Sequence, residues 1–222
     1  MIRNVGIKPF VMAMLLTFLP ALATAGKISG TVKVRGLRTP ENILVYVSSA
    51  PKVSVELSSY EFVMDQRNLT FIPYILPIVV GSSVRFPNND KVDHNVFSLS
   101  RTKKFNLGSY KPGESKTVIF DRPGIVEVRC DVHAEMLAYI LVLKNPYFAI
   151  TDKKGRFEIP DTRYLERLGI TGVKDLPSGK YLVKTWHQKL KTGKQRVVVP
   201  ENGVVSVKFA LSRGTAGVLY KR

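Results

Sequence analysis

The chain has 222 residues, a formal net charge of +17 and 45% hydrophobic residues, which is the composition of a folded protein rather than a disordered one. Its single cysteine excludes an internal disulfide, and its three histidines exclude a protein that needs several histidine-rich metal sites. The length suits one large domain or two small ones.

Residues 1–25 have the pattern of a secretory signal peptide. Arg3 and Lys8 precede an apolar run that ends in Ala23-Thr24-Ala25, and we expect cleavage after Ala25 and export to the periplasm. An uncleaved membrane anchor is the alternative. Cleavage would leave 32 basic and 17 acidic residues, a net charge of +15. This charge favours an acidic protein or an anionic membrane surface as partner, and we expect no nucleic-acid partner after export.

The rest of the chain reads almost wholly as β-structure, with short apolar runs separated by Gly, Pro, Asn and Asp. One short helix is expected around 162–170. The predicted strands are 27–34, 42–49, 68–71, 77–86, 94–99, 115–120, 124–130 and 137–143, followed by a second group at 148–152, 155–159, 180–187, 194–199 and 204–211. This pattern predicts an all-β protein built from sandwiches.

The stretch CDVHAEM, residues 130–136, contains the only cysteine and one of the histidines. In the strand before it, Val126, Val128 and Cys130 share one face, so the alternation directs the thiol inward. A buried cysteine can be inert, but His133 and Met136 follow within one loop. Cysteine, histidine and methionine together are the soft ligands that suit copper, while zinc remains chemically possible in the same site.

A further histidine must come from elsewhere in the chain, either His94 or His187. His94 is the better candidate because it begins an apolar strand directly after a turn-rich loop. His187 follows Trp186 inside a strand, where a structural role is more common, so its role stays open. One cysteine, two histidines and a weak axial methionine form the blue-copper arrangement.

The segments GSSVRFPNNDKVDHNVF and GIVEVRCDVHAEM together resemble the cupredoxins, the group of plastocyanin and amicyanin. The short C-x-x-H-x-x-M spacing is most similar to amicyanin, and the resemblance covers about 55–145. It implies a Greek-key β-sandwich with one type 1 copper, in which His94, Cys130 and His133 are equatorial ligands and Met136 is axial.

Three neighbouring residues also match or depart from the cupredoxin pattern. Asn95 matches a position just outside the ligand set that joins the two ligand loops through hydrogen bonds. Phe86 matches an aromatic core position. Arg129 stands where an aromatic residue is common, so no electron route is carried over from plastocyanin.

The segments ITDKKGRFEIPD and LPSGKYLVKTWHQKL resemble a carboxypeptidase-regulatory, or transthyretin-like, β-sandwich, with a hairpin turn at 152–155. We therefore predict a cupredoxin domain at 55–146, a transthyretin-like sandwich at 148–212 and a basic tail at 213–222. Residues 27–50 belong either to that second sandwich, with the cupredoxin domain inserted, or to the cupredoxin domain itself. The whole arrangement resembles an exported group described as methylamine-utilisation-like.

These features predict electron transfer with an acidic or membrane-associated redox partner. The alternative is copper storage or delivery, or an adhesion module, without a redox role. We do not expect an enzyme, because copper oxidases need more histidines than this chain contains. The oligomeric state is not predicted.

Overall fold

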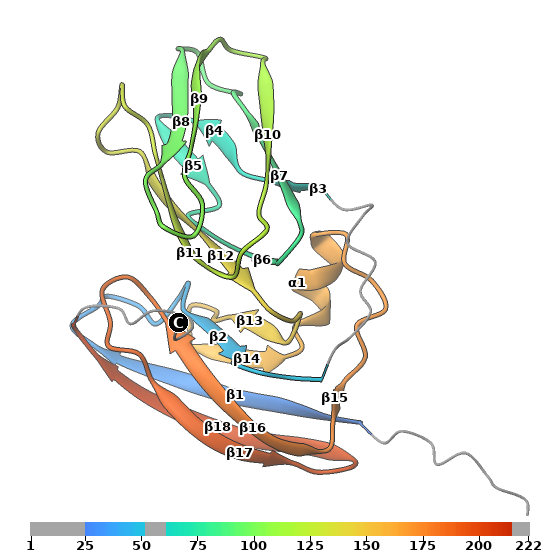
Figure 1. Ribbon diagram of the computed structural model, residues 1–222. Coiled ribbons are helices and arrows are strands. Elements are labelled where there is room, and N and C mark those ends of the chain that lie inside the picture. Colours follow the sequence, from blue (N-terminus) through green and yellow to red (C-terminus); the bar gives the residue numbers. More distant parts are fainter. Residues whose placement is uncertain (1–24, 52–60, 215–222) are drawn as a thin grey trace, which may run out of the picture.

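The computed structural model describes residues 25–51 and 61–214, and Figure 1 shows them as two β-sandwiches with one short helix between them. The predicted signal peptide and most of the predicted tail lie outside these residues. No helix in the described part of the chain is long and apolar enough to cross a membrane. The fold is all-β, as predicted.

The sandwich formed by residues 61–143, here the middle sandwich, contains two facing sheets and a small hairpin. One sheet has the order β6-β12-β11-β8-β9 and the other β10-β7-β3, while β4 pairs with β5. The strands are β3 (Glu61–Val63), β4 (Asp65–Arg67), β5 (Thr70–Ile72), β6 (Ile75–Val79), β7 (Ser83–Pro87), β8 (His94–Ser98), β9 (Phe105–Tyr110), β10 (Ser115–Ile119), β11 (Gly124–Arg129) and β12 (Leu137–Leu143).

The other sandwich, here the terminal sandwich, is built from 25–51 and 144–214. One sheet has the order β14-β1-β15, with β18 also paired to β1, and the other sheet has the order β13-β2-β16-β17. The strands are β1 (Ala25–Arg35), β2 (Leu44–Val47), β13 (Phe148–Ile150), β14 (Arg156–Ile159), β15 (Leu176–Pro177), β16 (Gly179–Trp186), β17 (Lys194–Val199) and β18 (Gly203–Ser212).

Strands from both ends of the chain pair within the terminal sandwich. Strand β1 runs parallel to β18 from Gly26↔Gly203 to Arg35↔Ser212, and β2 lies between β13 and β16. Val32 and Val45 belong to one buried cluster with Phe157 and Val183. Residues 25–47 therefore pack with strands that follow Ile150, although the residues of the middle sandwich lie between them in the sequence.

The two sandwiches share apolar contacts where they meet. Trp186 of the terminal sandwich packs edge-on against Tyr139 of β12, with ring centroids 5.2 Å apart. Tyr139 in turn contacts Tyr74, whose hydroxyl accepts a 2.7 Å hydrogen bond from Gln188. Leu44 belongs to the same buried cluster as the middle-sandwich core. The apolar core is thus continuous between the sandwiches.

Several predicted elements are confirmed. Helix α1 (Thr162–Arg167) forms inside the predicted range, and the side chain of Asp161 caps it by accepting the N–H of Tyr164. The predicted turn at 152–155 forms, with the N–H of Gly155 donating to the Asp152 carbonyl, but it does not join a hairpin, because β13 pairs with β2 and β14 pairs with β1 in the other sheet.

Other boundaries were wrong. The strand predicted at 77–86 is two strands, because the chain turns at 79–82, where Gly81 has φ +94 and the N–H of Ser82 donates to the Val79 carbonyl. Strands β3, β4, β9 and β15 were not predicted. Arg213, the first residue of the predicted basic tail, bridges to Leu190 and donates to the Gly36 carbonyl.

Candidate metal centre

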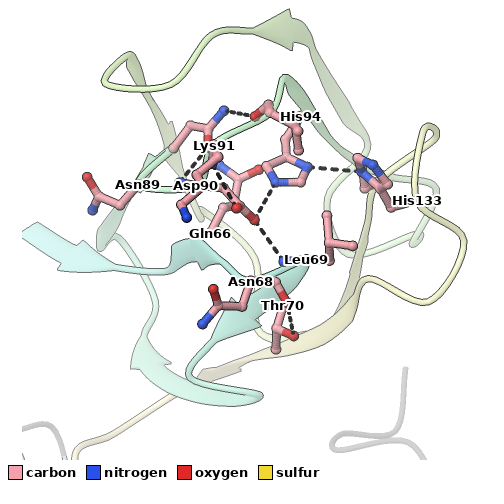
Figure 2. Close-up of polar contacts among 12 residues, drawn as sticks. Gln66, Asn68, Leu69, Thr70, Asn89, Asp90, Lys91, His94 and His133 are labelled. Atoms are coloured by element: carbon pink, nitrogen blue, oxygen red, sulfur yellow. Dashed lines mark hydrogen bonds and ion pairs between the residues drawn. The ribbon is translucent and has the colours of Figure 1, made fainter.

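His94 is the first residue of β8, and its side chain is fully buried. One ring nitrogen, Nε2, lies 3.0 Å from Oδ2 of Asp90, and the other, Nδ1, faces His133 (Figure 2). Asp90 is held in place because its Oδ2 also accepts the N–H of Leu69 at 2.7 Å. With Nε2 donating to this carboxylate, Nδ1 is the nitrogen whose lone pair is free for a metal.

The loop before His94 is fixed by a buried asparagine. Asn88 donates its side-chain amide to the carbonyls of Val92 and Tyr110, and its Oδ1 accepts the N–H of Asp90. Asn88 is fully buried, and its bond to the Tyr110 carbonyl is buried with it. The turn-rich sequence before His94 therefore folds into one defined conformation that sets the position of the histidine.

The hydrogen bonds to Asp90 also hold its carboxyl in the charged form. The N–H of Leu69 has the largest effect, burial opposes it, and His94 and the N–H of Lys91 add to it, so the pKa of Asp90 falls to about 2. At neutral pH, Asp90 is an acceptor that orients the His94 ring.

Cys130 directly follows β11, and its thiol points inward as predicted from the alternation. Val126 and Val128 are fully buried on the same face, and Cys130 is 4% exposed. The backbone N–H of Asn95 donates to the Cys130 Sγ at 3.4 Å. A hydrogen bond to sulfur from the residue beside His94 links the two ligand-bearing segments.

His133 completes a cluster whose ligand atoms converge. The ligand atoms of His94, Cys130 and His133 all lie within 4.8 Å of one another. The two Nδ1 atoms are 3.1 Å apart, and the Cys130 Sγ lies 3.9 Å from the His133 Nδ1. Metal–nitrogen bonds of about 2.0–2.1 Å and metal–sulfur bonds of about 2.3 Å can span both separations from one ion. The donor set and its spacing therefore fit a single soft or borderline metal.

The remaining predicted site residues lie close to this cluster in the chain. Met136 is buried, and its N–H donates to the His133 carbonyl at 3.0 Å. The side-chain amide of Asn95 donates to Asn106 at 2.7 Å, so the link to the cysteine runs through the Asn95 backbone. Phe86 is fully buried in the core, as expected for a packing residue.

Arg129 and His187 are not members of the cluster. Arg129 is exposed and pairs with Glu127 beside it on β11. His187 is buried in the terminal sandwich, where its Nδ1 accepts the N–H of Lys189 at 3.2 Å. Burial lowers the pKa of His187, so it is neutral at pH 7. These contacts give His187 a structural role.

Sequence reasoning did not identify Asp90 and Asn88 as site residues. Both stand in the stretch FPNNDKVDH, whose Asn and Asp residues indicate a turn without showing which of them faces the histidine. The one available signal was the spacing of Asp90 four residues before His94. Their partners Leu69 and Tyr110 come from distant segments, so the contacts depend on the tertiary fold.

Several solved structures are similar to this chain, all at low sequence identity. No family model and no curated protein matches the chain. A purple cupredoxin from Nitrosopumilus maritimus is 23% identical over 38% of this chain and 99% of its own, with a TM-score of 0.33. A mutant of amicyanin in its reduced state is 20% identical over 42% of this chain and 96% of its own, with a TM-score of 0.36.

A copper-containing nitrite reductase from Thermus scotoductus SA-01 is 20% identical over 51% of this chain, with a TM-score of 0.38. This chain covers only 28% of that enzyme. Because the identities and TM-scores are low, the metal assignment depends on the ligand geometry of this chain.

Proposed function

We propose that this protein is an exported type 1 copper protein that transfers electrons and is not an enzyme. The observation that carries the proposal is the convergence of the His94, Cys130 and His133 ligand atoms within 4.8 Å. A thiolate with two imidazoles is a ligand set for copper electron transfer. In this proposal Met136 is the weak axial ligand and the protein holds one copper.

Bound copper would supply one-electron redox chemistry, and the residues of the chain would keep the ligand set rigid. Asp90 orients the His94 ring, and Asn88 fixes the loop that carries both residues. The N–H of Asn95 stabilises negative charge on the Cys130 sulfur. A site held by buried hydrogen bonds changes little between two oxidation states, which favours fast transfer.

His133 is the proposed electron port, because it is the only partly exposed member of the cluster in the described structure. Exposed apolar side chains lie in the same loops, with Val92 at 43% and Val132 at 59% exposure. The apolar side chains favour a short-lived contact with another protein at this end, and we propose a membrane-associated redox partner in the periplasm.

Copper storage or delivery is the second candidate, and the partly exposed His133 is the observation that favours it. A carrier must surrender its ion, and an accessible ligand allows a competing ligand to start the exchange. An electron-transfer site must keep copper in both oxidation states. The rate of copper loss to a competing ligand therefore separates the two functions.

The terminal sandwich fits the proposal as a supporting module. Its turn at 152–155 and its pairing of β1 with β18 agree with a transthyretin-like sandwich that carries an inserted cupredoxin domain. We propose this domain division, and the kinship with the methylamine-utilisation-like group, on the sequence resemblance.

The direct test of copper binding is the visible absorption spectrum of residues 26–222 after addition of Cu(II). We expect an intense blue or green band from the Cu–thiolate bond, absent in Cys130→Ser. His187→Ala is the matched control and should keep the band, because His187 lies outside the cluster. A colourless wild-type protein would contradict the proposal.

A further inference from the structure

The basic residues are distributed unequally between the sandwiches. The middle sandwich, 61–143, contains ten basic and nine acidic residues, a net charge of +1. The terminal sandwich, 25–51 with 144–214, contains 19 basic and 7 acidic residues, a net charge of +12. The large positive charge of the protein is therefore a property of the sandwich without the metal cluster.

Part of this charge lines one face of the β16–β17 hairpin. Lys180 pairs with Val198 across the hairpin, and Leu182 pairs with Arg196, so all four side chains project from the same face. The opposite face, with Tyr181 and its neighbours, packs into the core. The two strands contain no acidic residue, and no described ion pair involves Lys180 or Arg196.

The same face carries a groove with an exposed apolar rim. The groove has a volume of about 330 Å³ and is lined by Lys180, Arg196, Val198 and the neighbouring strand residues. Val198 is 63% exposed although it is a valine in a strand. Val204 of β18 is also exposed, but it belongs to the other sheet, where its partner Lys27 is ion-paired with Glu158. Lys180, Arg196 and Val198 thus place two cations and an exposed valine on one face of the hairpin.

The first described strand, β1, also begins at this end. Gly26, at the start of β1, pairs with Gly203 at the start of β18, and Figure 1 shows both strand ends beside the start of β16. Cleavage after Ala25 would leave a positive α-amino group on Gly26 at this end. The start of β8 and the β11–β12 loop, which carry the metal cluster, lie at the far end of the other sandwich.

We propose that this end of the terminal sandwich docks on the anionic face of a phospholipid membrane. Lys180 and Arg196 bind lipid phosphates in the groove, and Val198 enters the headgroup region. Exposed apolar residues among cations are the combination that binds anionic bilayers, since each cation near the surface adds to the attraction. Docking in this orientation points His133 away from the lipid, toward a redox partner.

The test is co-sedimentation of residues 26–222 with phosphatidylcholine vesicles that contain or lack phosphatidylglycerol. We expect binding only to the anionic vesicles, with affinity falling as salt rises. The double variant Lys180→Gln/Arg196→Gln should bind roughly 30-fold more weakly. Lys104→Gln/Lys111→Gln, on the middle sandwich, removes the same charge and should bind nearly as wild type.

Three results would overturn the proposal. Wild-type protein that does not sediment with anionic vesicles has no such surface. Equal losses in the two double variants would mean that net charge, and not this face, drives binding. Complete release from vesicles by polyglutamate at matched charge would assign the groove to an acidic polypeptide. Vesicle binding does not depend on copper, so this outcome is separate from that of the copper proposal.

Discussion

The two sandwiches differ in how they use polar residues. The middle sandwich has almost balanced charge, but it buries a connected set of polar groups, among them Asn88, His94 and Asn95. The terminal sandwich carries most of the net charge at its surface, and no candidate metal cluster is found in its described residues. In our proposals, the buried polar groups of the middle sandwich hold the metal ligands and the surface charge of the terminal sandwich binds a membrane, so the two sandwiches have separate tasks.

The largest effect is expected at the contact between the sandwiches. Trp186 is 3% exposed and packs on Tyr139, so Trp186→Ala removes a large buried side chain that both cores share. We expect a loss of about 3–5 kcal/mol in unfolding free energy and two calorimetric transitions in place of one. Leu99→Ala, at an exposed position, is the control and should change little. If Trp186→Ala still unfolds in one transition with a small loss, the sandwiches do not depend on this contact.

A smaller effect is expected from the residue that orients His94. Asp90→Ala removes the acceptor at His94 Nε2 and should weaken copper affinity by roughly 10–100-fold. Asp93→Ala deletes the same charge from an exposed position of the same loop and should leave the affinity near wild type. Competition titration with a chelator measures both. Equal losses in the two variants would show that local charge, rather than ring orientation, determines affinity.

The smallest effect concerns a turn of the terminal sandwich. Asp152 accepts the N–H groups of Arg156 and Lys154, and the Arg156 N–H has the largest share in lowering the pKa of Asp152. A lowered folded-state pKa contributes stability above the unfolded pKa, and this contribution is lost as pH falls through the folded value.

Asp152→Asn should therefore cost about 0.5–1 kcal/mol at neutral pH, because the carboxylate is partly exposed. Urea unfolding of both proteins at several pH values measures the difference. We expect the two stabilities to converge as the pH drops below about 4. A difference that persists in acid would mean that the charge of Asp152 is not the cause.

The sequence was informative where one strand or one loop contains the whole signal. The alternation in β11 predicted the buried thiol, and the short loop after it predicted that His133 would lie near the sulfur. The strand start at His94 was also predictable, because a turn-rich stretch meets an apolar run there. These are local patterns, and the structure confirms them.

The sequence was less informative where a contact joins distant segments. Asp90 is fixed by the N–H of Leu69, and Gln66 bonds to the hydroxyl of Tyr110, in pairs that no local pattern connects. The break at Gly81 was missed because the apolar alternation continues on both sides of the turn. The unequal division of charge could not be predicted, because the basic residues of the terminal sandwich come from two segments, 25–51 and 144–214, that only the fold brings together.

The most direct test of the electron-transfer claim is a reduction experiment on the Cu(II)-loaded protein in the presence of a Cu(I) chelator. We expect the visible band to bleach rapidly on addition of a reductant and to return fully on reoxidation, with copper retained by the protein. Transfer of copper to the chelator on reduction would contradict the account and would favour copper delivery.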